Sequence, residues 1–210
     1  MSTSRRLVDG RELRNYFTTL SDLLATARVT LADGEGVGYA DAVNQIIGRA
    51  LSVHQAGNKL IFVGNGGSAA IASHMATDYL KNGNIRALAL NDGAMLTCLG
   101  NDLGYAQVFA KQIELHSRAG DMLVAISSSG RSASILNAVA AARSNDCSIV
   151  TLSGFDPDNP LRRLGDLNFF IASDRYGFVE IAHLTICHAV LDFLCGLRSS
   201  PAEGAAGVSA

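Results

Sequence analysis

Apolar side chains recur every three or four positions in the first part of the chain. Between Arg11 and about Leu31 this spacing predicts an amphipathic helix, which the segment DGEGVG at 33–38 ends. A second helix is predicted from about Tyr39 to Ala56, and Gly57 suits its C-terminal cap. Residues 1–57 are therefore expected to form an N-terminal helical hairpin that packs on the same domain.

From residue 58 onward, short apolar runs alternate with helical stretches. The runs show no polar alternation, which is expected of strands that helices cover on both faces. Strand–helix alternation favours right-handed crossovers, so the sequence predicts an α/β three-layer sandwich with a five-stranded parallel sheet. This domain is expected to span 58–198, and the small, polar tail 199–210 is expected to be disordered. The expected strands are 59–64, 85–91, 121–127, 147–153 and 167–173, and the expected helices are Ala69–Lys81, Tyr105–His116, Ser132–Ser144, the short Pro160–Leu164 and Phe178–Leu197.

Composition and charge narrow the class of protein. Hydrophobic residues make up 48% of the 210 residues and charged residues 17%, which indicates a globular chain with a real core. The formal net charge is −2 and basic residues do not cluster, so nucleic-acid binding is not expected. No apolar run reaches the roughly 18 residues of a membrane span, and the N-terminus lacks the pattern of a secretory signal. The four scattered cysteines are typical of free thiols in a cytoplasmic protein.

Two turns rich in glycine and serine follow predicted strands and precede predicted helices. The first is Gly64–Ser68 (GNGGS) and the second is Ser127–Ser132 (SSSGRS). Unpaired backbone N–H groups and a positive helix dipole favour an anion at such a point, and glycine lets the backbone approach the ligand. Either turn alone could simply cap a helix. Two of them in one sheet favour a phosphate, and because neither is a Walker A or GxGxxG motif, a single phosphate on a small metabolite fits better than a nucleotide.

Acid–base and metal-ligating side chains lie on two of the predicted helices. His74 and Asp78 are four residues apart and share one helix face, where such a pair can chelate a cation. Glu180, His183 and His188 lie on the last helix. Glu180 and His188 are eight residues apart, about 12 Å along a helix axis, which is too far for one ion unless the helix start bends or subunits exchange residues. Each histidine alone could instead be an ordinary packed or solvated side chain.

Three segments together resemble the SIS (sugar isomerase) domain family, in its sedoheptulose 7-phosphate isomerase branch. They are GNGGSAAIASH at 64–74, LNDGAMLTCLGNDLGY at 90–105 and ISSSGRS at 126–132, and the resemblance extends over about residues 10–196. It implies a five-stranded parallel sheet and a homotetramer with active sites at subunit interfaces. It also implies conversion of sedoheptulose 7-phosphate to D-glycero-D-manno-heptose 7-phosphate through an enediol, for nucleotide-heptose and surface polysaccharide synthesis (lipopolysaccharide or capsule).

The resemblance also assigns roles to residues. His74 and Asp78 match the family's histidine and catalytic glutamate, Glu180 matches a glutamine, and His188 matches the general-acid histidine; in some members these four positions hold zinc. Asp78 is one methylene shorter than glutamate, and Glu180 adds a negative charge, so either one could be the base. The residues that the resemblance places at the substrate are Asn65, Gly66, Gly67, Ser68, Asn101, Asp102, Ser127, Ser128, Ser129 and Ser132.

Two other classes of function share the same turns. A non-catalytic SIS module would sense a phosphosugar or bind the bacterial replication initiator, and it would have no need of the polar face formed by His74 and Asp78. An isomerase of another sugar phosphate would keep both the turns and this pair. No segment of the chain reads as a DNA-binding helix-turn-helix.

Overall fold

A six-stranded sheet forms the centre of the computed structural model, which describes residues 7–196. The strand order is β1-β6-β5-β4-β2-β3, and all neighbours are parallel except the edge pair β1 and β6. The predicted tail 199–210 lies outside the described residues. The strands are β1 Arg28–Leu31, β2 Leu60–Gly64, β3 Ala87–Ala89, β4 Met122–Ser127, β5 Ser148–Gly154 and β6 Leu167–Ile171.

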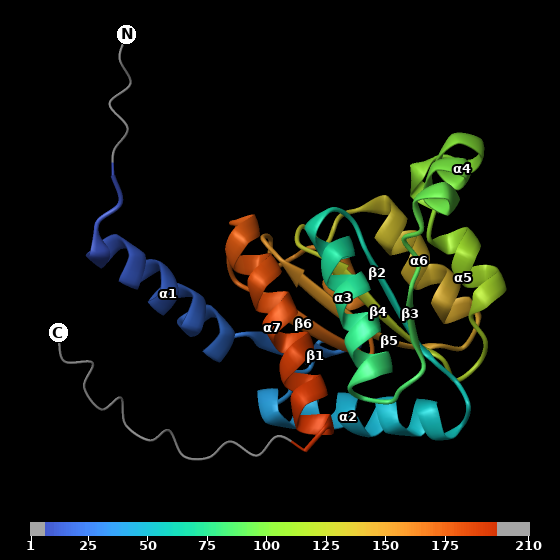
Figure 1. The fold of residues 1–210 in the computed structure, drawn as a ribbon, viewed down its shortest axis with the longest axis horizontal. Helices are drawn as coiled ribbons and strands as arrows, with labels where there is room; N and C mark the ends of the chain where they lie inside the picture. Colours follow the sequence, from blue (N-terminus) through green and yellow to red (C-terminus); the bar gives the residue numbers. More distant parts are fainter. Residues whose placement is uncertain (1–6, 197–210) are drawn as a thin grey trace, which may run out of the picture.

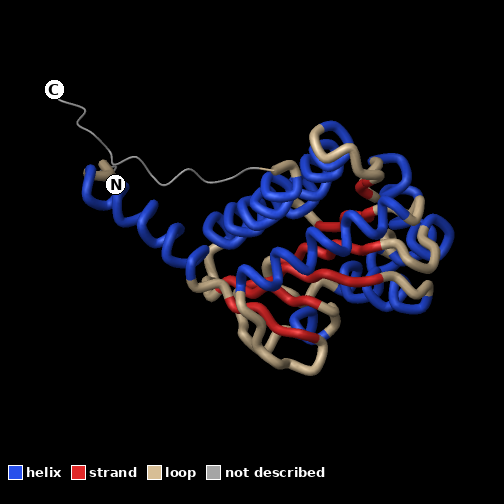
Figure 2. Tube along the Cα trace, turned by 90° about the horizontal axis from the view of Figure 1, so that it is seen from below, coloured by secondary structure: helices blue, strands red, loops and turns tan. Residues whose placement is uncertain are grey.

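Helices cover both faces of the sheet, and Figure 2 shows the strands as a layer between them. Successive residues of one strand belong to different cores: Phe62 packs with α2, α3 and α7, whereas Ile61 packs with α5 and α6. This explains the strand runs without polar alternation and confirms the predicted three-layer α/β fold. The helices are α1 Gly10–Ala25, α2 Tyr39–Gln55, α3 Gly67–Lys81, α4 Gly93–Leu103, α5 Ala110–His116, α6 Ala133–Ser144 and α7 Tyr176–Leu194, with short 3₁₀ segments η1 Tyr105–Gln107 and η2 Pro160–Arg163.

The first helix is shorter than predicted, and the sheet has one strand more. Helix α1 ends at Ala25, and the segment after it pairs antiparallel with β6, with Arg28 opposite Phe170 and Leu31 opposite Leu167. Val29 is buried in this pairing. The helical spacing of apolar residues continues past Ala25 into Arg28–Leu31. The backbone of this segment nevertheless pairs with the free edge of the sheet, and sequence periodicity does not reveal such a partner.

The two N-terminal helices are connected through β1, and both pack against α7. In Figure 1, α1 projects past α7 and away from the sheet, whereas α2 lies along the lower edge of the molecule. None of the residues of α1 is buried, and Leu13, Tyr16 and Phe17 are exposed. The division into an N-terminal unit at 1–57 and a main domain at 58–198 stays a prediction.

Helix α4 was not predicted, and the predicted helix Tyr105–His116 is divided into η1 and α5. The side chain of Asp92 caps α4 by accepting a hydrogen bond from the backbone N–H of Met95 at 2.9 Å. Gly104, with φ 83° and ψ 149°, ends α4 in a conformation that favours glycine. Leu96 and Leu99 are the residues of α4 that pack on the core. Because so few side chains of α4 face the core, the sequence of this segment shows only a weak helical pattern.

Helix α7 is long and apolar enough to cross a membrane by length and composition, with a mean hydropathy of 1.4 over its best window. The same pattern is typical of a core helix in a globular protein. Eight residues of α7 are buried, including Val179, Ala182 and Ile186, which pack into the core shared with α2 and α3. We therefore interpret α7 as a core helix.

Candidate functional site

The neighbouring strands β2 and β4 bring the two glycine- and serine-rich turns together. Their parallel register places Gly64 beside Ile126, so both turns leave the sheet at its carboxyl edge. A cavity of about 270 Å³ lies between them. All eight turn residues that the sequence predicted as substrate contacts line this cavity. The lining consists of Asn65, Gly66, Gly67, Ser68, Ile126, Ser127, Ser128, Ser129, Ser132, Tyr176 and Glu180.

The turns present hydrogen-bond donors to this cavity. Helix α3 starts after Gly66 and helix α6 after Ser132, and neither helix has a side-chain cap on its first N–H groups. The hydroxyl of Ser128 is buried and has no hydrogen-bond partner among the described residues. Leaving a buried hydroxyl unpaired costs about 1–3 kcal/mol, so a polar ligand in the cavity would remove a real penalty. The positive dipole ends of two helices and an unpaired serine hydroxyl favour an anion in the cavity, whereas the carboxylate of Glu180 at its edge opposes one.

Close approach of the chain explains the glycines of the first turn. A Cβ on Gly67 would collide with the carboxylate of Glu180, and a Cβ on Gly64 would collide with the backbone carbonyl of Ser68. Gly66 adopts φ 54° and ψ −123°, a conformation that side chains disfavour. Glycine therefore allows Glu180 of α7 to reach the edge of the cavity.

Three of the four predicted metal ligands form one cluster between α3 and α7. The Nε2 atoms of His74 and His188 are 3.0 Å apart, and Nε2 of His74 is 3.4 Å from Oδ2 of Asp78. One donor atom from each residue lies within 4.8 Å of the others. Tetrahedral zinc with bonds of about 2.0–2.1 Å to nitrogen keeps its ligands about 3.3 Å apart, so this donor set fits the ion.

Glu180 is not part of this cluster, because the eight residues that separate it from His188 place it at the serine-lined cavity. The cluster lies two helical turns from the cavity along both α3 and α7. Seven residues separate Gly67 from His74, a rise of about 10.5 Å along a helix. A ligand whose anionic end lies at the turns could therefore extend past Glu180 to His74 and His188, if it is about 10 Å long.

His183, between these positions on α7, has a different environment. Its side chain is buried, and Nε2 lies 3.1 Å from the carbonyl oxygen of Ser153. A carbonyl only accepts, so Nε2 carries the proton, and Nδ1 has no hydrogen-bond partner among the described residues. Burial lowers the pKa of His183 to about 4. His183 is therefore a neutral core residue that ties α7 to β5.

Asn101 and Asp102, the other predicted substrate contacts, lie on the last turn of α4 and are exposed. The amide of Asn101 donates to Oδ1 of Asp102 at 2.8 Å, and neither residue lines the cavity. Sequence reasoning missed Tyr105, which follows this pair and donates its hydroxyl hydrogen to Oδ1 of Asn65 at 2.7 Å. It also missed Tyr176, which lines the cavity. Only the position of Tyr105 in the segment 90–105 pointed toward the site.

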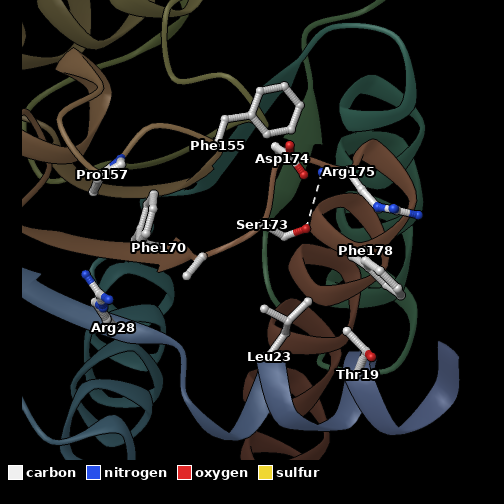
Figure 3. A pocket seen from close by; sticks show the side chains of 11 residues that line it. Thr19, Leu23, Arg28, Phe155, Pro157, Phe170, Ser173, Asp174, Arg175 and Phe178 are labelled. Carbon is white, nitrogen blue, oxygen red and sulfur yellow. Dashed lines mark hydrogen bonds between the residues drawn. The ribbon is translucent and has the colours of Figure 1, made fainter. Parts of the chain in front are cut away.

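A second, larger cavity of about 460 Å³ lies where α1, the end of β6 and the start of α7 meet (Figure 3). Its walls carry the aromatic rings of Phe155, Phe170 and Phe178, with Arg28 and Arg175 among its charged groups. Neither the serine turns nor the histidine cluster reaches it. It borders the C-terminal half of α1.

Comparison with known proteins agrees with this geometry. The SIS domain family model matches residues 16–154. A phosphoheptose isomerase from Rhodospirillum rubrum is 36% identical over 192 residues, which cover 89% of this chain and 95% of the relative. One from a Geobacter species is 34% identical over 172 residues, covering 79% of this chain and 88% of the relative. This chain belongs to the phosphoheptose isomerase family of SIS-domain proteins.

The fold agrees with the same family. The structure of a phosphoheptose isomerase from Neisseria gonorrhoeae superposes with a TM-score of 0.73 at 29% identity, covering 88% of this chain and 98% of that one. The resemblance drawn from the three sequence segments is thus confirmed, as is the SIS fold. The roles of individual residues in this family member stay predictions.

The buried, neutral His183 predicts a pH-dependent stability. Its pKa is about 4 in the folded chain and about 6.5 in the unfolded chain, so the unfolded state takes up the proton first as the pH falls. We expect this contribution, at most about 3 kcal/mol, to be complete above pH 6.5 and lost as the pH falls toward 4. Denaturant unfolding of wild type and His183→Gln from pH 7.5 to 4 measures it.

The stability difference between the two proteins should shrink as the pH falls, because glutamine does not titrate. A difference that stays constant over this range would show that His183 does not carry the proton linkage.

Proposed function

We propose that the protein is an aldose–ketose isomerase that converts sedoheptulose 7-phosphate to D-glycero-D-manno-heptose 7-phosphate. One observation carries the proposal: the donor-rich cavity and the carboxylate–imidazole cluster lie on the same pair of helices, two turns apart. The phosphate and the carbonyl stand at opposite ends of the seven-carbon chain. The two sites therefore match the two ends of this substrate.

The phosphate binds at the two turns, where Ser68, Ser127, Ser128, Ser129 and Ser132 supply hydroxyl donors beside the helix N-termini. Glu180 then accepts hydrogen bonds from hydroxyls in the middle of the sugar. Binding energy from the phosphate positions the distant C1 and C2 atoms, which is how a remote group contributes to catalysis.

The reaction requires a base for a carbon-bound proton and an acid partner for the oxygens on two adjacent carbons. Asp78 and His188 have donor atoms within 4.8 Å of each other, which suits groups that act on neighbouring atoms. We assign Asp78 as the base that takes the C1 proton and returns it to C2. In the metal-free site, His188 moves the proton between O1 and O2 through the enediol. Glu180 lies at the phosphate-binding cavity, which makes it the weaker candidate for the base.

The cluster of His74, Asp78 and His188 would hold a zinc ion. When bound, zinc would polarise the substrate carbonyl as a Lewis acid. His74 is half exposed, with 51% of its side chain accessible, whereas 18% of Asp78 is accessible. His74 thus forms the outer edge of the site and Asp78 its inner wall.

Assembly would complete this open site. The exposed apolar residues of α1 and the accessibility of His74 support a homotetramer in which a neighbouring subunit covers α1 and the cluster. The proposed reaction places the protein in the cytoplasm, where its product would enter nucleotide-heptose synthesis for surface polysaccharide.

We expect turnover of sedoheptulose 7-phosphate in heavy water to place deuterium at C2 of an aldose product, since the base exchanges its proton with solvent. Proton and carbon NMR follow the reaction. A protein that binds the phosphosugar without forming an aldose would be a sensor rather than an isomerase.

Substitutions distinguish the two candidate bases. Asp78→Asn should lower kcat by about 10²–10⁴-fold, the usual contribution of a positioned base. Glu180→Gln is the matched control, because glutamine keeps the length and one accepting oxygen of Glu180 without its charge; its kcat should stay within a few-fold of wild type. The opposite pattern would move the base to Glu180.

Metal content tests the cluster independently of activity. Wild type purified with added zinc should retain about one ion per chain by elemental analysis, and His74→Ala should retain much less, because one of three ligands is lost. His116→Ala removes an exposed histidine on α5 and should leave the content unchanged. Equal zinc in wild type and His74→Ala would exclude this ligand set.

Light scattering after gel filtration tests the assembly. Wild type should have four times the chain mass of 22.0 kDa. Phe17→Glu places a charge on the exposed side of α1 and should dissociate the tetramer, whereas Leu115→Glu, at a still more exposed position on α5, should not. A wild-type monomer would contradict the proposed interface.

A further inference from the structure

A chain of hydrogen bonds runs from η1 to the second turn through the first. The hydroxyl of Tyr105 donates to Oδ1 of Asn65 at 2.7 Å. The amide Nδ2 of Asn65 then donates to Oγ of Ser132 at 2.8 Å and to Oγ of Ser134 at 2.9 Å. Asn65 therefore bridges the two turns, and Tyr105 holds Asn65 from outside the cavity, which it does not line.

The direction of these bonds determines what Ser132 presents to a ligand. An amide has one accepting and one donating end, and in the orientation found the phenol donates to the accepting end on the Tyr105 side. Ser132 thus receives a hydrogen bond from Asn65 on its oxygen, and its hydroxyl also lies 3.2 Å from that of Ser134. When Ser134 is the donor of that second bond, the hydrogen of Ser132 is left to donate elsewhere. Ser132 lines the cavity, so this hydrogen is available to a phosphate oxygen. With the amide reversed, Ser132 would donate to Asn65 and present lone pairs to the anion.

The backbone of η1, to which Tyr105 belongs, is also held in place. The side-chain amide of Asn137, on α6, donates to the carbonyl oxygen of Ala106 at 3.0 Å. Because α6 also carries Ser134 and begins directly after Ser132, this bond fixes η1 relative to the second turn. Tyr105 as a whole residue is 57% exposed. Tyr105 is thus a surface residue whose hydroxyl makes a specific hydrogen bond to Asn65.

We propose that Tyr105 is a positioning residue for phosphate binding: acting through Asn65, it sets the donor direction of the hydrogen-bond chain that ends at Ser132. The inference rests on the proposed phosphosugar site and adds a residue outside it. It explains why an exposed tyrosine follows α4 at this position. The chemistry at Asp78 and His188 lies two helical turns away and is not part of this chain.

The decisive variant is Tyr105→Phe, which removes the phenol oxygen and keeps the ring. Losing a hydrogen bond of ordinary strength should raise KM for sedoheptulose 7-phosphate about tenfold. The inhibition constant of inorganic phosphate should rise by the same factor, and kcat should stay within about twofold, because ground-state and transition-state binding weaken equally. Tyr39→Phe is the matched control, since the Tyr39 hydroxyl makes no hydrogen bond with the described residues and α2 lies away from the cavity.

A double-mutant cycle tests the path through Asn65. In an Asn65→Ala background, Tyr105→Phe should have almost no further effect on either constant, because the partner through which it acts is gone. Additive effects would overturn the proposal, as would unchanged constants in Tyr105→Phe or a fall in kcat at constant KM.

Direct binding separates this inference from the proposed function. If the protein does not turn over the heptose phosphate, the proposed reaction fails, while the dissociation constant of inorganic phosphate, measured by calorimetry, still tests Tyr105. A tenfold weaker constant in Tyr105→Phe but not in Tyr39→Phe supports the inference, and equal constants in all three proteins overturn it.

Discussion

The parallel pairing of β2 with β4 is the constraint on which the site depends. Each strand alone ends in a short turn that exposes a few backbone donors. Because the strands are neighbours in register, the two turns open into one cavity at the carboxyl edge of the sheet, where an open α/β fold binds its ligands. The segments Gly64–Ser68 and Ser127–Ser132 are about sixty residues apart in the chain, so only the sheet brings their donors together.

Tight packing behind the cavity keeps this arrangement in place. Asn159 is fully buried, and its amide donates to Ser153, Gly154 and Asp156. Its Oδ1 occupies the space where a Cβ on Gly130 would lie. The second turn thus rests on a satisfied polar residue, whereas the hydroxyl of Ser128 on the ligand side remains unpaired. This contrast between a satisfied back and an unsatisfied front is typical of a preorganised anion site.

The helix pair α3 and α7 extends the site beyond the turns. Both helices leave the cavity in the same layer. Glu180 lies at the cavity, and His74, Asp78 and His188 lie two turns further on. A rigid helix transfers the position fixed by the turns to the cluster with little loss of precision. The exposure of His74 and of α1 indicates that the isolated chain does not exclude water from the cluster, which is why assembly is part of the proposed function.

The sequence by itself determined the α/β class, the five parallel strand segments and both glycine- and serine-rich turns, because buried strands and glycine–serine turns have strong local patterns. It also identified His74 and Asp78 as a pair, since four residues on a helix always share a face. Only the tertiary structure decided that Arg28–Leu31 is an edge strand and that Glu180 joins the turns rather than the histidines. It alone connected Tyr105 to Asn65. These features depend on how distant segments of the chain pack together: the edge pairing, the contacts between helices, and the hydrogen bond between residues forty positions apart. The local spacing of residue types does not specify such packing.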